Sequence, residues 1–220
     1  MTLPVTIAHR AGNSYERLDR ALAAGVDAVE IDTRLDHGRF AGRHDGRLFF
    51  LPVYGGRWYV RFSLARATYL DEVLRRVAGR ASLLVDVKTT GVRALKLLLD
   101  TLRAQNAIAG TRISSGYWNL MRIARVSEPD LRVYYSMGKP EELRRFWQLQ
   151  EKTHEAKGVS IKERLLNKTL VDRFLAEGIE IAAYDVYDLR RAHELIAWGV
   201  AAIISGDLSL LRALKEPSPD

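Results

Sequence analysis

Short apolar runs alternate with longer amphipathic stretches along the whole chain, and eight of each can be marked. Several of the short runs are apolar on successive residues, which is typical of strands buried on both faces. The expected strands are Val5–His9, Ala28–Thr33, Leu83–Lys88, Arg112–Ser115, Leu131–Ser136, Gly158–Ile161, Ile179–Asp185 and Ala201–Ser205. The expected helices are Tyr15–Ala24, Tyr69–Ala78, Val92–Gln105, Tyr117–Val126, Glu141–Ala156, Leu165–Glu177, Leu189–Trp198 and Leu208–Leu214.

Start and stop signals support these helices. Asp188 is placed to cap one helix, Pro140 stands in the first turn of another, and Gly25, Gly178 and Gly199 fall where helices should end. Strict strand–helix alternation predicts a parallel sheet, and eight units are the number that closes a single-domain (β/α)8 TIM barrel over residues 1–215. An open doubly wound sheet is the alternative, but the glycine-rich phosphate loop that such nucleotide binders usually carry is absent. The polar tail, residues 216–220, is expected to be disordered.

One segment, residues 35–68, interrupts this rhythm after the second expected strand. It is rich in glycine and carries the aromatic residues Phe49, Phe50, Tyr54, Trp58, Tyr59 and Phe62. A long insertion at the carboxyl end of a barrel strand is where active-site walls are built, so we expect it to line the site. A packed surface hairpin without a role in chemistry is the alternative.

Composition removes several classes of function. The 220 residues contain no cysteine, which excludes disulfides, thiolate catalysis and Cys-ligated metals. No apolar run is long enough for a signal sequence or a spanning helix, so a cytoplasmic protein is expected. The net charge of +7 favours anionic partners. Because no nucleic-acid-binding motif is present, a phosphate-bearing small molecule is favoured over DNA or RNA, and peripheral contact with an anionic membrane stays open.

Acidic and basic residues gather where the first three expected strands end. Glu30 and Asp32 are two positions apart, as are Asp86 and Lys88, so each pair shares one side of an extended strand. Three carboxylates brought together would repel one another unless a divalent cation, Mg²⁺ or Ca²⁺, compensates their charge, with Arg10 and Lys88 nearby. A salt-bridge network that merely fills the barrel mouth is the alternative.

Two of the five histidines fall beside these acids. His9 ends the first expected strand, and His44 follows the second. Because imidazole titrates near pH ~6.5, such a pair can act as base and acid around neutrality. The other three, His37, His154 and His193, are expected in a turn or on helix surfaces.

These motifs resemble the glycerophosphodiester phosphodiesterase family. The matching residues are His9-Arg10-Ala11-Gly12, Gly25-Val-Asp27 leading into Glu30-Ile-Asp32, His44-Asp45, Asp86-Val-Lys88, Tyr69-Leu-Asp-Glu-Val-Leu74 and Gly178-Ile-Glu-Ile-Ala-Ala-Tyr-Asp-Val-Tyr187. The resemblance implies a barrel enzyme that hydrolyses small phosphodiesters, in which His9 and His44 are the catalytic acid/base pair. It further implies that Glu30, Asp32 and Asp86 bind one divalent metal and that Arg10 and Lys88 hold the phosphate.

The chain also departs from the family pattern. Asn13 is the only counterpart of a Pro-Glu-Asn segment, Asp86 replaces the commoner glutamate, and Tyr184 stands where tryptophan is usual. Asn13 is therefore expected to contact the phosphate or to stand in the shell around the metal, and Tyr184 is expected as a further substrate contact. Two alternatives stay open: a lysophospholipase D-like enzyme, as in the related sphingomyelinase D branch of the same barrel, and a barrel that binds phosphorylated headgroups without turnover.

Overall fold

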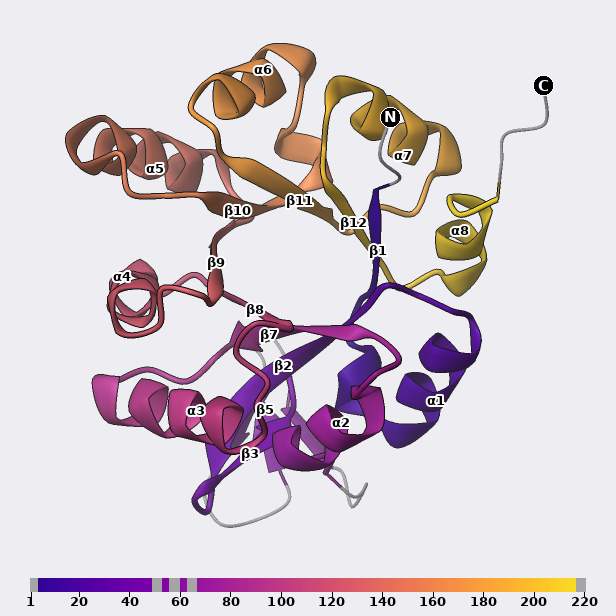
Figure 1. The fold of residues 1–220 in the computed structure, drawn as a ribbon, viewed down its shortest axis with the longest axis vertical. Helices are drawn as coiled ribbons and strands as arrows, with labels where there is room; N and C mark the ends of the chain where they lie inside the picture. The colour runs from indigo at the N-terminus through magenta and orange to yellow at the C-terminus, as the bar shows by residue number, and fades with distance from the viewer. Residues whose placement is uncertain (1–3, 49–52, 56–59, 63–66, 217–220) are drawn as a thin grey trace.

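The computed structural model describes residues 4–48, 53–55, 60–62 and 67–216, with side chains described outside 46–66. Eight parallel strands form a ring surrounded by eight helices (Figure 1). The ring closes because β1 pairs with both β12 and β2. The barrel strands are β1 (Val5–Ala8), β2 (Ala28–Asp36), β7 (Ser82–Val87), β8 (Thr111–Ser115), β9 (Arg132–Met137), β10 (Gly158–Lys162), β11 (Glu180–Tyr184) and β12 (Ala202–Ser205). The predicted TIM barrel is confirmed.

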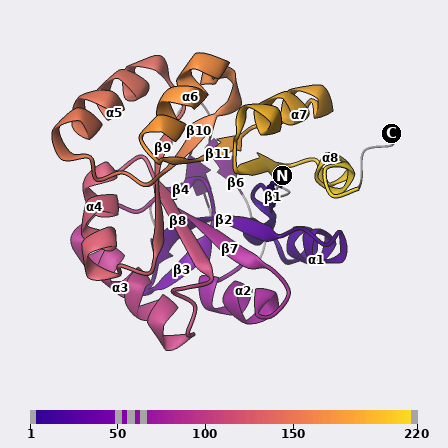
Figure 2. The same ribbon diagram turned by 45° about the horizontal axis from the view of Figure 1, so that its top comes forward.

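The helices follow the strands in order around the outside (Figures 1 and 2). They are α1 (Tyr15–Ala23), α2 (Leu70–Val77), α3 (Val92–Ala104), α4 (Trp118–Ser127), α5 (Pro140–Thr153), α6 (Lys168–Ala176), α7 (Leu189–Trp198) and α8 (Leu208–Ala213). Two 3₁₀ turns, η1 (Ala11–Asn13) and η2 (Glu163–Leu165), follow β1 and β10. Among the described residues, no helix has both the length and the apolar character needed to span a membrane.

Alternation along the strands divides the apolar residues between two cores. Outward side chains such as Ile31 and Val85 pack with the helices in the larger core. Inward side chains fill the barrel axis with a smaller cluster of Ile7, Ala28, Leu84, Tyr134, Ala182, Ala202 and Ile204. The side chains further along the same inward rows, toward the carboxyl ends of the strands, are polar or charged, and they build the site.

Element ends differ from the predicted ones for local reasons. Helix α5 stops at Thr153, short of the predicted Ala156, because His154 takes a left-handed conformation with φ 48°. Helix α6 begins at Lys168 instead of Leu165, because the Asn167 side chain accepts a hydrogen bond from Leu170 N and caps it. The Asp188 cap and the left-handed helix end at Gly199 are confirmed.

The predicted insertion begins as a continuation of β2, which pairs antiparallel with β3 (Arg39–Gly42). The short strands β4 (Gly46–Leu48), β5 (Val53–Gly55) and β6 (Val60–Phe62) form a second sheet. Residues 49–52, 56–59 and 63–66 lie outside the described residues, as do the side chains of all six aromatic residues named above. The active-site wall therefore stays a prediction, and so does the disordered tail, of which residues 217–220 are not described.

Hydrogen bonds to Asp27 stabilise the opposite end of the barrel. Its carboxylate accepts hydrogen bonds from Thr6 N at 2.9 Å, Thr6 Oγ1 at 2.6 Å and Lys215 Nζ at 2.6 Å. Burial opposes ionisation of this carboxyl, but the hydrogen bonds from Lys215 and Thr6 outweigh it and lower the pKa of Asp27. Asp27 thus ties the last helical turn of the chain to the start of the barrel.

Candidate active site

A cavity of about 160 Å³ lies where the carboxyl ends of the strands meet. Its charged and imidazole lining comes mainly from β1, β2, β7 and the loops that follow them, while β8 to β11 supply hydroxyl groups. The lining residues are His9, Arg10, Glu30, Asp32, His44, Leu84, Asp86, Lys88, Ser114, Ser136, Ser160, Tyr184, Asp185 and Ile204. All the predicted site residues except Asn13 are therefore in one place.

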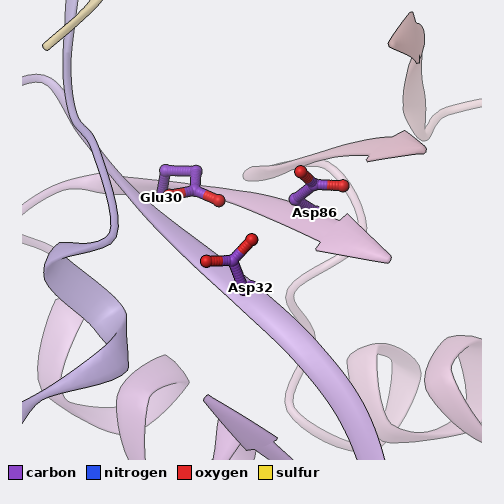
Figure 3. Close-up of side chains that lie close together, drawn as sticks. All are labelled: Glu30, Asp32 and Asp86. Atoms are coloured by element: carbon purple, nitrogen blue, oxygen red, sulfur yellow. The ribbon is translucent and has the colours of Figure 1, made fainter. Parts of the chain in front are cut away.

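Strand register brings the three acids together. Asp32 on β2 pairs directly with Asp86 on β7, and Glu30 lies two residues earlier on the same inward row. Figure 3 shows the three carboxyl groups gathered on one side of these two neighbouring strands. One oxygen from each lies within 4.8 Å of the others, and Glu30 and Asp32 are almost fully buried. The predicted convergence of the acids is confirmed as geometry.

Backbone and side-chain donors hold the acids of β2 in place. The backbone N–H of Arg10 donates to Glu30 Oε2. Asn13 Nδ2 donates to Asp32 Oδ2 at 2.8 Å, and Asp32 N donates to Asn13 Oδ1 at 2.9 Å. Asn13 therefore contacts the acidic trio through Asp32, and it is not part of the cavity wall.

Two cations face the three carboxyl groups. Lys88 Nζ lies 2.6 Å from Asp86 Oδ2 and 3.3 Å from Asp32 Oδ1, and Arg10 Nε lies 3.3 Å from Asp32 Oδ2. Burial opposes the charge of Lys88, but Asp86 and Asp32 outweigh it and raise the pKa of Lys88 to about 12. This lysine is therefore a permanent cation of the site.

The acids are not fully compensated by these two cations. Burial, with the charges of Asp32 and Asp86, raises the pKa of Glu30 well above its usual value. Burial also raises the pKa of Asp86, although Lys88 works in the opposite direction. A closely spaced set of oxygen ligands with excess negative charge suits a hard divalent cation, so these three residues fit a metal site.

Each histidine of the cavity has a carboxylate at its Nδ1 atom. His44 Nδ1 lies 3.0 Å from Asp45 Oδ1, and His9 Nδ1 lies 3.6 Å from Asp185 Oδ1. Burial, with the charge of Arg10, lowers the pKa of the His9 imidazole to about 4. A carboxylate at Nδ1 orients the ring and leaves Nε2 as the nitrogen available for proton transfer.

Comparison with known proteins gives a consistent picture of the fold. No protein-family model and no curated protein matches the chain. Among solved structures, it is similar to a putative glycerophosphoryl diester phosphodiesterase from Silicibacter pomeroyi, with 18% identity, a TM-score of 0.79 and coverage of 97% of this chain and 93% of that one. It is likewise similar to an Oleispira antarctica phosphodiesterase in complex with the product sn-glycerol-3-phosphate, with 18% identity, a TM-score of 0.75 and coverage of 97% of this chain and 98% of that one. A Thermotoga maritima glycerophosphodiester phosphodiesterase is similar with 18% identity, a TM-score of 0.75 and coverage of 98% of this chain and 100% of that one.

The chain shares their fold. The likeness covers nearly the whole length of each chain.

The structure adds site residues that sequence reasoning missed. Asp185, at the end of β11, contacts His9 and also lies 2.8 Å from Lys162 Nζ through its Oδ2 atom. Arg34 donates from Nε to the His44 carbonyl at 3.0 Å and from Nη1 to the Lys88 carbonyl at 3.2 Å. The strand-end position of Asp185 was a usable signal, but no sequence pattern indicates the contacts of Arg34.

Tyr184 lies in the cavity wall, and its hydroxyl is already engaged. Its Oη donates to the Met137 carbonyl at 3.1 Å, beside Gly138, where an added Cβ would approach it to 2.6 Å. Burial, with the charge of Asp185, raises the pKa of Tyr184 to about 12. The phenol is therefore a fixed, neutral part of the wall.

Proposed function

We propose that this chain is a metal-dependent phosphodiesterase that hydrolyses glycerophosphodiesters to glycerol phosphate and an alcohol. The observation that carries the proposal is that His9, His44 and the three acids line one cavity at the carboxyl ends of the barrel strands. Support comes from the shared fold, since the neighbours are named as phosphodiesterases and one holds sn-glycerol-3-phosphate.

Glu30, Asp32 and Asp86 would hold one Mg²⁺ or Ca²⁺ ion. When bound, this ion would neutralise negative charge that develops on the phosphate in the transition state. Lys88 and Arg10 border the same carboxylates, so their cationic groups are placed to bind the non-bridging phosphate oxygens.

The two histidines would move the protons. One takes a proton from the attacking water as its oxygen forms a bond to phosphorus, and the other gives a proton to the leaving alcohol oxygen as the P–O bond to that oxygen breaks. The carboxylates of Asp45 and Asp185 face the two Nδ1 atoms, at 3.0 and 3.6 Å, which leaves Nε2 for each transfer. Atoms and charge balance with water as the one further reactant.

Asn13 and Tyr184 would support this arrangement. We propose that Asn13 orients Asp32 through its two hydrogen bonds. Tyr184, fixed by the Met137 carbonyl, would shape the wall against which the substrate lies.

Turnover of a substrate panel tests the proposal. Glycerophosphocholine, glycerophosphoethanolamine and glycerophosphoglycerol are incubated with the protein in Mg²⁺, in Ca²⁺ and in chelator, and release of glycerol phosphate is measured. We expect metal-dependent activity that His9→Ala and His44→Ala each reduce by ~10²-fold or more. His193→Ala, on the exposed side of α7, is the matched control and should leave the activity unchanged. Activity that survives loss of both cavity histidines would contradict the mechanism.

The same panel separates the alternatives. Lysophospholipids are added because an acyl chain needs apolar lining, whereas the described cavity is lined mainly by charged residues and serines. We therefore expect the small diesters to be the better substrates. Ligand uptake without product would instead indicate a barrel that binds headgroups.

A further inference from the structure

A second and larger cavity opens beside His9, with a volume of about 880 Å³. It lies between the β1–α1 unit and the β12–α8 unit, and α1 and α8 are neighbours in both views of the barrel (Figures 1 and 2). His9, Arg10 and Asp185 line both this cavity and the one that contains the acidic trio. A phosphodiester bound at the trio can therefore extend one of its two arms between α1 and α8.

Three arginines contribute positive charge to the wall of this second cavity. Arg17 and Arg20 stand three positions apart on α1, hence on one helix face, and Arg10 adds a third guanidinium. Within the described part of the chain, Arg17 makes no ion pair, and Arg20 faces only the exposed Glu16, 3.5 Å away. These two guanidinium groups are available to a ligand.

The two acids in the same wall, Asp185 and Asp207, each have partners in the structure. Asp207 accepts hydrogen bonds from Ser209 N at 2.9 Å and Ser209 Oγ at 2.5 Å, because it caps α8. Asp185 faces Lys162 and His9. A cationic arm would thus meet three guanidinium groups, whereas the same wall holds two carboxylates.

We propose that the cavity between α1 and α8 is a subsite for an alcohol arm that carries a phosphate group, held by Arg17 and Arg20. This inference rests on the proposed function, because it assigns the substrate class of that same site. A guanidinium binds phosphate through two parallel hydrogen bonds, which suits it to this role better than a lysine. The volume also falls within the range of ~300–1,000 Å³ that small-ligand sites occupy, and so accommodates more than a choline or an ethanolamine.

Three diesters whose second arm is cationic, neutral or anionic test the inference. They are glycerophosphocholine, glycerophosphoglycerol and glycerophosphoglycerol with a terminal phosphate, and kcat/KM is measured for each. The wild-type chain is expected to prefer the phosphorylated diester over glycerophosphocholine by about tenfold. The double variant R17A/R20A should lower the ratio of phosphorylated to neutral diester by about fivefold, the effect of two exposed ion pairs. R144A, an exposed arginine on the distant α5, should leave that ratio unchanged.

The outcomes separate this inference from the proposed function. Equal kcat/KM for all three diesters, or an R17A/R20A double variant that lowers all three equally, would overturn the subsite while leaving the phosphodiesterase in place. If nothing is turned over, the enzyme proposal fails, and the same diesters are compared by calorimetry. Tighter binding of the phosphorylated diester that R17A/R20A abolishes would still support the subsite, whereas equal affinities would overturn it.

Discussion

Glu30→Gln removes one charge from the acidic trio while keeping its shape. The carbonyl oxygen of glutamine can still accept the hydrogen bond from Arg10 N that Glu30 accepts. With one oxygen of each acid within 4.8 Å of the others, two ionised groups repel by the order of 3 kcal/mol at an effective dielectric constant of about 20. Lys88 and Arg10 offset part of this repulsion. The metal-free variant is therefore expected to be at least as stable as the wild-type chain.

Added metal should make the wild-type chain more stable than the Glu30→Gln variant. An ion at about 100 times its Kd stabilises the folded state by about 2.7 kcal/mol. For a chain of this length, about 2–4 °C of Tm corresponds to each kcal/mol, so the wild-type Tm should rise by about 5–11 °C. Glu30→Gln loses a buried charged ligand and should gain less than about 2 °C under the same conditions.

Thermal unfolding in chelator, in millimolar MgCl₂ and in millimolar CaCl₂, at matched ionic strength, measures both effects. Glu16→Gln is the matched control, because Glu16 is an exposed residue of α1 with 80% of its side chain accessible. This control should follow the wild-type chain in all three solutions. An equal rise in Tm for the wild-type chain and Glu30→Gln would refute the assignment of the ion to the trio.

Three further substitutions test the supports of the barrel and the site. Asp27→Asn should lower the unfolding free energy, measured by urea titration above about pH 5, by about 1 kcal/mol. Because folding lowers the pKa of Asp27, the difference from the wild-type chain should vanish as the pH falls through that pKa. A difference that persists at pH 2 would contradict this linkage. Gly12→Ala places a Cβ 2.6 Å from the Ile31 side chain and should lower the Tm by about 4–8 °C. Gly110→Ala, where the added Cβ has no atom within 4 Å, is the control and should leave the Tm unchanged. Equal Tm values for the two variants would refute the close-packing argument. Asn13→Ala should weaken Mg²⁺ binding about 10-fold in calorimetry, and unchanged affinity would show that Asn13 does not orient the acids.

The barrel and its acidic centre could be predicted because both follow from periodicity. Eight alternating units leave few parallel folds, and a spacing of two places Glu30 and Asp32 on one side of β2. The carboxyl ends of neighbouring parallel strands meet at one end of the barrel, which is why Asp86 joins them. Sequence reasoning therefore located the trio without knowledge of the strand register, and the register then paired Asp32 directly with Asp86.

Contacts that depend on loop conformation could not be predicted in this way. Asp185 reaches His9 with a left-handed backbone, φ 61°, and Arg34 holds two carbonyl groups from a strand that extends three residues beyond the predicted end at Thr33. The cavity between α1 and α8 depends on how two units distant in sequence meet when the barrel closes. No sequence motif marks Arg17 and Arg20, and the closed ring places them in the wall of the same cavity as His9.

The acids of β2 also position the loop that carries His9. Arg10, the next residue, has φ 55°, a conformation that costs a non-glycine residue of the order of 1 kcal/mol or more and persists only where neighbours enforce it. Here the enforcing contacts are the bond from its own N–H to Glu30 and the paired bonds between Asn13 and Asp32. The same carboxylates that fit a cation thus fix the chain between His9 and α1. Any change that displaces them should disturb the histidine and the entrance to the α1–α8 cavity together, which is why charge-only substitutions are the informative ones at this site.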